Sequence, residues 1–246
     1  MTQVKLGDKN IPFIYQGNEL LYPVPVKDGL VLWYDFKSMK NSDVSRGVAK
    51  DLSGNGNNGT LQNFAYNNES GYNNGLNLDG VDDRILVGNS ASIINLNLEV
   101  TIEMVLHFKE VPTGWRWIIG NTSDAAANTG YAIAYSPNNP KGLSFMAGGT
   151  INTDGYVPVE NEKVHIVGKI DKGNNMHLYM NGQMVKTRLS FKNMVNSSLP
   201  VTIGKASYYD SPHVKTLIKN VKIYNRALTD QEIQQNYKLE KERWGL

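Results

Sequence analysis

The sequence contains no cysteine among its 246 residues. Disulfides, cysteine-ligated zinc sites and a thiol nucleophile are therefore excluded. The four histidines, His107, His165, His177 and His213, are too dispersed to indicate a metal cluster. No apolar run approaches the roughly 20 residues that span a bilayer, and the polar first ten residues lack the apolar region of a signal peptide. We expect a protein that stays in the cytoplasm or leaves it without a cleaved signal.

A surplus of charge of one sign is also missing. Lysine and arginine total 25, aspartate and glutamate total 23, and the formal net charge is +2. Nucleic-acid binders usually carry a basic stripe, whereas here the lysines are scattered along the chain. We interpret the charges as a solvated surface and expect neither a nucleic acid nor a membrane as partner.

Asparagine and glycine, in contrast, are abundant, with 29 and 23 residues. Both tolerate the positive φ angles that tight turns require. This composition disfavours a mostly helical protein, and the absence of a Gly-X-Y period excludes collagen. A chain of this length can bury a sizeable core as one all-β domain.

Alternation of apolar and polar residues predicts strands along most of the chain. Thr101–Phe108, with Val105 as an exception, and Lys163–Asp171 show the period of two that a half-buried strand requires. Met176–Val185 contains Asn181-Gly182, the dipeptide preferred in a type I′ hairpin turn. Further strands are predicted at Leu30–Phe36, Leu76–Leu78, Arg84–Val87, Trp115–Ile119, Tyr131–Tyr135, Leu143–Met146, Val201–Ile203 and Leu217–Tyr224. Many short strands separated by turn signals indicate a sandwich or jelly roll.

One helix is predicted near the C-terminus. Thr229 and Glu232 form a T-x-x-E capping box, and Leu228 and Ile233 occupy the two staple positions. Ile233 and Tyr237 share a face that we expect to lie on the sandwich edge.

Residues 1–28 differ from the rest and are predicted to form an arm before a domain at 29–246. Pro12, Pro23 and Pro25 interrupt short apolar pieces. Proline fixes φ and removes a backbone donor, so this segment is expected to be extended and outside the centre of a sheet. The arm either lies on the domain or reaches a neighbouring molecule.

Several motifs occur in the order of a known family. They are Gly29–Phe36, Asp51–Thr60, Leu78–Asp83, Val164–Asp171, Leu178–Gly182, Ile203-Gly204 and Val221–Ile233. Over about Gly29 to Tyr237 the chain resembles LamG-like jelly-roll domains of the concanavalin A-like lectin/glucanase group. The resemblance implies an all-β fold, a two-sheet antiparallel jelly-roll sandwich, here with an extended N-terminal arm and a short C-terminal helix. In this family the concave face often binds glycans.

The family includes glycosidases, whose two carboxylates lie on one strand in an E-x-D-x-(x)-E pattern. Glu99 and Glu103 have no acid between them, and Glu160 and Glu162 follow Pro158 in an expected loop. No G-x-S-x-G nucleophile elbow is present either. We predict a protein that is not an enzyme, with a glycan-active hydrolase as the alternative.

Sugar-binding sites favour aromatic faces, usually carried on loops. The candidates for ligand contact are Trp115, Trp117, Tyr131, Tyr156, Tyr208 and Tyr209. Tyr208-Tyr209 is the less strand-like pair and is expected to be exposed. Trp115 and Trp117 share one face of a strand, so packing between the sheets is the alternative for them.

Related jelly rolls often hold a structural calcium ion, which binds six to eight oxygen ligands. The acidic candidates are Asp51, Asp79, Asp82 and Asp83. Asp51 belongs to the Asn- and Gly-rich run Asp51–Leu61, which reads as a tight loop and lacks the Lys-Ser/Thr of a phosphate-binding loop.

The arm carries a weaker resemblance. Ile11–Tyr15 and Tyr22–Gly29 are similar to segments that precede such domains in virion proteins of phages infecting Gram-positive bacteria. This implies a tail, baseplate or decoration protein, assembled in the host cytoplasm and located in the phage particle. The arm would bind other virion proteins or sister subunits of a homo-oligomer, and the sandwich would contact host surface glycans. A purely structural virion protein without a ligand is the alternative.

Overall fold

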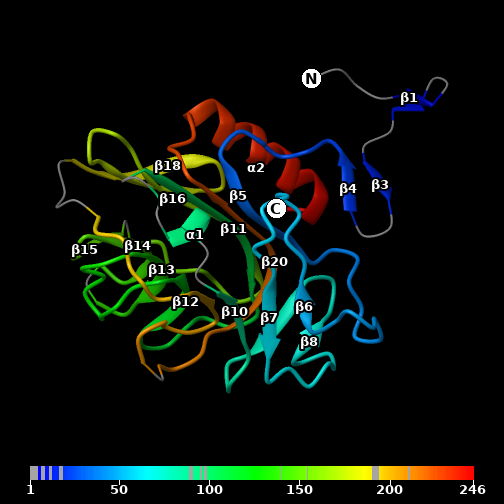
Figure 1. The fold of residues 1–246 in the computed structure, drawn as a ribbon, viewed down its shortest axis with the longest axis horizontal. Coiled ribbons are helices and arrows are strands. Elements are labelled where there is room, and N and C mark those ends of the chain that lie inside the picture. The colour runs from blue at the N-terminus through cyan, green and yellow to red at the C-terminus, as the bar shows by residue number, and fades with distance from the viewer. Residues whose placement is uncertain are drawn as a thin grey trace.

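The protein is an all-β sandwich of two antiparallel sheets with a helix near the C-terminus, which confirms the predicted fold class (Figure 1). The computed structural model describes residues 5–6, 9–10, 13–16, 19–88, 91–94, 96, 99–138, 140–153, 155–189, 194–209 and 211–246. Among these residues no helix is long and apolar enough to cross a lipid bilayer.

One sheet, which we call the helix-covered sheet, has the order β18-β17-β16-β11-β20-β9-β8, and β5 also pairs with β20. Its strands are β5 (Leu30–Asp35), β8 (Gly71–Tyr72), β9 (Leu76–Asp79), β11 (Val100–Phe108), β16 (Glu162–Ile170), β17 (Met176–Met180), β18 (Gln183–Arg188) and β20 (Lys215–Tyr224).

The other sheet, which we call the open sheet, has the order β15-β14-β13-β12-β19-β10-β7-β6. Its strands are β6 (Val48–Ala49), β7 (Gly59–Gln62), β10 (Arg84–Gly88), β12 (Arg116–Gly120), β13 (Tyr131–Ser136), β14 (Gly142–Ala147), β15 (Thr150–Thr153) and β19 (Val201–Ile203). The short helix α1 (Ala91–Ile94) lies in the connection between β10 and β11.

The core lies between the two sheets and follows the predicted alternation. Ile102, Met104 and Leu106 of β11 point inward and are fully buried. Gly168 of β16 faces the Phe145 ring of the open sheet, where a Cβ atom would lie only 2.3 Å from a ring carbon. Glycine at this position therefore lets the sheets approach each other around a bulky ring.

The predicted hairpin is confirmed at β17–β18. Met180 pairs with Gln183 across the turn, and Asn181 and Gly182 have φ angles of 49° and 75°. These positive φ angles are what a type I′ turn requires, so the local sequence sets the register of this edge hairpin.

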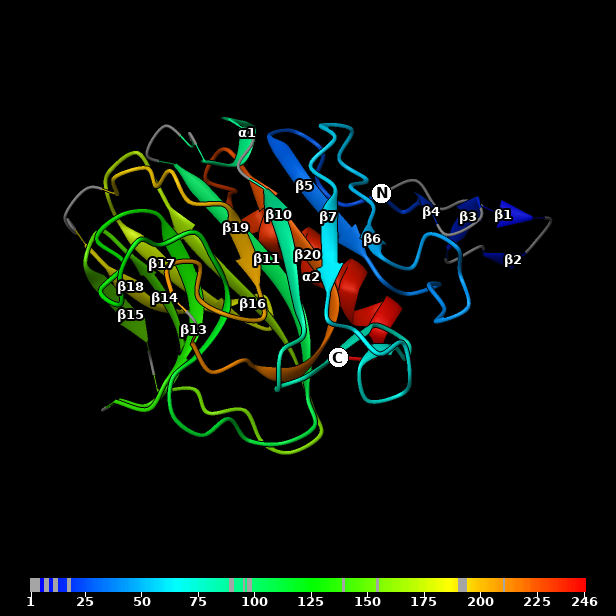
Figure 2. The same ribbon diagram turned by 60° about the horizontal axis from the view of Figure 1, so that its bottom comes forward.

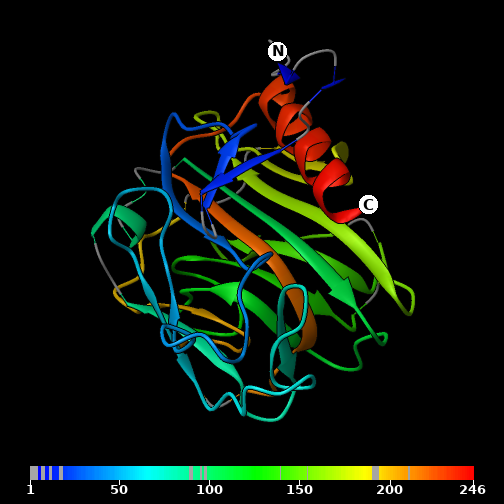
Figure 3. The same cartoon turned by 90° about the vertical axis from the view of Figure 1, so that its right-hand side faces the viewer.

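Helix α2 (Asp230–Trp244) begins with the predicted capping box. The Thr229 hydroxyl accepts from the Glu232 backbone, and the Glu232 carboxylate accepts from the Thr229 backbone. The prediction that the helix packs on the sandwich edge was wrong, because α2 lies across the outer face of the helix-covered sheet (Figure 3). Buried ion pairs between the helix and the strands hold it there.

The arm forms two small antiparallel pairs outside both sheets. These are β1 (Lys5–Leu6) with β2 (Lys9–Asn10) and β3 (Ile14–Gln16) with β4 (Glu19–Tyr22), which project from one side of the sandwich (Figure 2).

Parts of the arm also contact the domain. Phe13 and Val26 pack against a buried cluster that includes Trp33, and the Val26 N–H donates to the Asn236 side chain at 2.9 Å. Pro12 lies outside the described residues.

Candidate functional site

The outer face of the open sheet carries a continuous row of aromatic rings. The Trp115 and Trp117 rings stack with their centroids 6.3 Å apart, and Trp117 meets Tyr208 edge-on at 5.8 Å. Tyr209 follows, with its ring centroid 4.4 Å from that of Tyr208. We call these four residues the aromatic ladder.

The neighbouring strands leave room for these rings. Along β13 the residues Tyr131, Ile133 and Tyr135 enter the core, whereas Ala132 and Ala134 face outward. Small side chains on the outer face allow large rings to lie over the sheet. The alternation Tyr-Ala-Ile-Ala-Tyr is the sequence signal that could have predicted the small side chains beneath the rings.

A bulge in β12 determines which of its side chains join the ladder and which join the core. The register shifts between Trp117 and Ile119, so that Ile118 and Ile119 both join the core while Trp117 faces outward. A bulge re-aims side chains in this way because two residues oppose one on the partner strand. Simple alternation would have placed Ile119 and Trp117 on the same face.

Exposure increases along the ladder. Trp117 is 3% exposed, Trp115 and Tyr208 are half-buried, and Tyr209 is 43% exposed. Burial and the neighbouring Tyr209 raise the pKa of the Tyr208 hydroxyl well above its ordinary value. Tyr208 is therefore a neutral hydrogen-bonding group at physiological pH, and Tyr209 is the ring most available to a ligand.

Hydrogen bonds hold the loop that carries the two tyrosines. The Ser207 hydroxyl donates to the Gly120 carbonyl of β12 at 2.6 Å, and the Ala206 N–H donates to the Ser211 hydroxyl at 2.8 Å. The loop is thereby tied to the strand that carries Trp117, which preorganises the rings.

The other aromatic candidates lie elsewhere. Tyr131 is 1% exposed and donates from the core to the Ile93 carbonyl at 3.1 Å. Tyr156 packs against the core and donates to a Glu162 carboxylate oxygen. The structure thus brings together Trp115, Trp117, Tyr208 and Tyr209, and does not bring Tyr131 or Tyr156 to them.

The carboxylate pairs noted in the sequence do not reach the ladder. Glu103 is fully buried on the opposite sheet beneath α2. The Glu162 carboxylate accepts from the Val159 N–H at 2.8 Å as well as from Tyr156. Within their described bounds, the eight strands of the open sheet contain no aspartate or glutamate.

Three of the calcium candidates gather beside β9. Ligand oxygens of Asp79, Asp82 and Asp83 lie within 4.8 Å of one another. Burial raises the pKa of Asp83 to about 6, and the nearby Asp79 and Asp82 carboxylates add to this rise. This all-oxygen donor set is of the kind that binds Ca²⁺. Asp83 is fully buried, and its two oxygens already accept from the Ser70 hydroxyl at 2.9 Å and the Asp79 N–H at 3.0 Å, so Asp79 and Asp82 are the more accessible ligands. An ion there would neutralise three carboxylates and fix the turn between β9 and β10.

Asp51 has a different role, because its carboxylate is already saturated. It accepts from the backbone N–H groups of Trp33, Ser53 and Asn57 and from the Ser53 hydroxyl, at 2.8 to 3.0 Å. These bonds organise the tight Asn- and Gly-rich loop predicted from the sequence.

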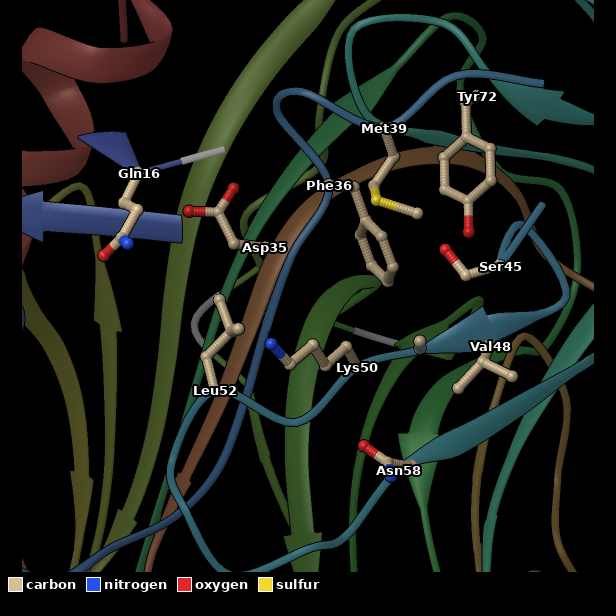
Figure 4. Close-up of a pocket in the computed structure, with 11 residues that line it drawn as sticks. Gln16, Asp35, Phe36, Met39, Ser45, Val48, Lys50, Leu52, Asn58 and Tyr72 are labelled. Carbon is tan, nitrogen blue, oxygen red and sulfur yellow. The ribbon is translucent and has the colours of Figure 1, made fainter. Parts of the chain in front are cut away.

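A separate pocket of about 550 Å³ lies between the arm and the end of the sandwich (Figure 4). Its lining is mostly apolar, with Phe36, Met39 and Leu52 among its residues. Two of its polar groups are already engaged, since Asp35 pairs with Arg243 and the Tyr72 hydroxyl donates to the Arg46 carbonyl. No local pattern in the sequence predicts this pocket, because its walls come from distant segments.

A family model described as "Concanavalin A-like lectin/glucanases superfamily" matches residues 79–234, more than half of the chain. The chain belongs to this superfamily. A comparison with curated proteins gave no significant match.

Solved structures with the same fold are distant in sequence. A Trypanosoma rangeli sialidase is 15% identical with a TM-score of 0.60, the match covering 87% of this chain and 33% of the sialidase. Domain 4 of the Geobacillus stearothermophilus arabinanase AbnA, solved with arabinotriose, is 16% identical with a TM-score of 0.54, covering 84% of this chain and 97% of that domain. The receptor-binding domain of a botulinum neurotoxin C/D mosaic is 13% identical with a TM-score of 0.59, covering 87% and 52%. The chain thus spans about a third of the sialidase, and these likenesses show the shared fold alone.

Proposed function

We propose that this chain is a non-catalytic carbohydrate-binding module that contacts a glycan through the aromatic ladder. The main observation behind this proposal is the row of four neighbouring rings on the outer face of the open sheet. Flat aromatic faces present large, rigid contact area to sugar rings at low entropic cost. The arabinotriose complex of AbnA domain 4 supports a saccharide as the ligand class.

The proposal of a non-catalytic role rests on the charge of this face. Glycoside hydrolysis requires two carboxylates that flank the bond to be cleaved. The strands under the ladder carry no acidic residue within their described bounds, Asp124 is a single carboxylate near enough to raise the pKa of Tyr208, and Glu103 is buried beneath α2. Hydrolysis of a bound saccharide would overturn this part of the proposal in favour of the alternative, a glycan-active hydrolase.

We further propose that the module works on a phage particle and contacts a host surface glycan, with the arm bound to other virion proteins or sister subunits of a homo-oligomer. The β1–β4 pairs project away from the sandwich, where they are available to a neighbour. Removing residues 1–12 spares Phe13 and Val26, which pack on the domain. This truncation deletes β1 and β2 and keeps β3 and β4. The truncated protein should fold normally but fail to enter particles or oligomers, and normal incorporation would refute an anchoring role of β1 and β2.

The binding site is tested by titrating the protein with arabinotriose and with a panel of cell-wall oligosaccharides. Tyr209→Ala should weaken binding by about tenfold, and Tyr209→Phe should bind nearly as the wild type because the ring remains. Leu189→Ala, at a more exposed apolar residue outside the ladder, is the control. No binding to any saccharide would favour a purely structural protein, and equal losses for Tyr209→Ala and Leu189→Ala would place the site elsewhere.

A further inference from the structure

A cluster of lysines lies on the helix-covered sheet, at the C-terminal end of α2. Lys37 follows β5, Lys163 is on β16 and Lys219 is on β20, and all three reach the last turn of the helix. The ammonium groups of Lys37 and Lys219 lie 4.5 and 5.1 Å from the centre of the Trp244 ring. Lys163 donates to the carbonyl oxygens of Trp244 and Gly245 at 2.8 and 3.2 Å.

Two residues at the end of β11 complete this group. Burial lowers the pKa of His107, and Lys219, Lys163 and Lys109 lower it further. Burial also lowers the pKa of Lys219 to about 8, together with Lys163, Lys37 and Lys109, and each of these charged neighbours is a cation. We call His107, Lys37, Lys109, Lys163 and Lys219 the lysine cluster. The Asp35 and Glu240 carboxylates act on Lys37, whereas the repulsion on Lys219 comes from cations alone.

Capping of the C-terminal end of α2 explains the presence of only some of the lysines in the cluster. Cations near a helix C-terminus offset the negative end of the helix dipole, which accounts for Lys37 and Lys163. Lys219 is 2% exposed, and its one hydrogen bond to a described residue goes to the carbonyl of Asn74, outside the helix. An ammonium has three donors. Lys109 lies near His107 and Lys219 and donates no hydrogen bond to the described residues of α2, so capping does not account for its charge.

Buried polar atoms without partners lie beside the cluster. The Nδ1 atom of His107 and both amide atoms of Asn220 are buried and have no hydrogen-bond partner among the described residues. Asn220 is adjacent to Lys219 and pairs with Val105, two positions before His107 on β11. A buried polar group without a partner costs about 1–3 kcal/mol. Hydrogen-bonding capacity at this end of the sheet therefore exceeds what the described residues satisfy.

We propose that the lysine cluster binds an oxyanion, a phosphate or sulfate group, beside Lys109 and Lys219 near the end of β11. Lysine binds such groups as a compact point charge, and an anion would relieve the repulsion among the ammonium groups. The unused donors of Lys219 and the charge of Lys109 supply the attraction. The aromatic ladder lies on the outer face of the other sheet, so the two sites are independent.

The test is calorimetric titration of the full chain with inorganic phosphate, inorganic sulfate and dextran sulfate, with neutral dextran as the uncharged control. Lys109→Met removes a charge but none of the hydrogen bonds that cap α2, and should weaken anion binding by about tenfold. Lys219→Met should have at least the same effect. Lys215→Met removes a charge from the same strand, where Lys215 pairs with the exposed Glu110, and should bind nearly as the wild type.

Each outcome decides the proposal. Saturable binding of inorganic phosphate or sulfate that Lys109→Met weakens supports a site for the free ion. Binding of dextran sulfate alone, with the same dependence, supports an anion carried on a polymer. Absence of binding to every anion, or equal losses in Lys109→Met and Lys215→Met, refutes the site. Tyr209→Ala should leave anion binding unchanged, so failure here is distinguishable from failure of the proposed glycan site.

Discussion

The outer faces of the two sheets are covered in opposite ways. On the helix-covered sheet, Glu103 and Lys222 of the strands and Glu240 of α2 are fully buried between the sheet and the helix, and Lys222 donates to both carboxylates at 2.7 Å. Asn236 of the helix also donates to Glu103 at 2.7 Å. On the open sheet the covering is a ladder of aromatic rings that ends at the exposed Tyr209.

This comparison distinguishes side chains that hold the fold together from side chains that a ligand can reach. Charges that are buried and paired hold one element on another, but they cannot meet a ligand without unfolding the helix. Tyr209, the most exposed ring of the ladder, can be reached by a ligand without any change in the fold. Titratable groups in a buried cluster are therefore no sign of catalysis here. The following substitutions test this contrast.

The largest effect is expected for Glu103→Gln. The change breaks a buried ion pair and leaves Lys222 with a single carboxylate partner, Glu240. Loss of one partner of such a pair costs about 3–5 kcal/mol of unfolding free energy, which chemical denaturation measures. The control Glu110→Gln breaks the exposed pair with Lys215 and should cost below about 0.5 kcal/mol. Similar costs for the two variants would contradict the structural role of the buried network.

The same network should make stability sensitive to acid. Burial raises the pKa of Glu103, but Lys222 and His165 outweigh this effect and hold it at about 2, below its ordinary value of 4.5. A depressed pKa stabilises the folded state above the unfolded-state value, and this stabilisation is lost as the pH falls from about 4.5 toward about 2. The difference in unfolding free energy between the wild type and Glu103→Gln should therefore shrink across this range. A constant difference would argue against an ionised Glu103.

A smaller effect is expected where α2 begins. Thr229→Ala removes the hydroxyl that accepts from the Glu232 backbone and should cost about 1 kcal/mol. Thr229→Ser keeps the hydroxyl and should retain most of the stability. Thermal unfolding of both variants measures how much the cap contributes beyond the ion pairs. A cost for Thr229→Ala as large as that of Glu103→Gln would mean that the cap, and not the network, determines how the helix is held.

The smallest effect is expected on the ladder. Tyr209→Ala removes an exposed ring and should change the unfolding free energy by less than about 0.5 kcal/mol, while saccharide binding falls. A loss of several kcal/mol would show that the ladder is a structural cover like α2, and the contrast between the two faces would disappear.

The local features of the fold were predictable from the sequence. The Asn181-Gly182 turn and the Thr229 cap depend on residues near one another in the chain, and the alternation of β11 reports the core face directly. The burial of the polar C-terminal end of α2 could not be predicted in this way. Glu240 and Arg243 resemble a solvated surface in sequence, but they are buried because their partners come from distant strands.

The sequence by itself determined that this protein is a cysteine-free β-sandwich, because turn chemistry and periodicity are local properties. Only the tertiary structure decided which aromatic residues stand together. Tyr131 and Ala132 are adjacent in the chain, yet one enters the core and the other lies beneath the ladder. The β12 bulge and the loop that carries Tyr208 and Tyr209 then set where the rings meet. These contacts join segments far apart in the chain, and their geometry exists only once the sheets have packed.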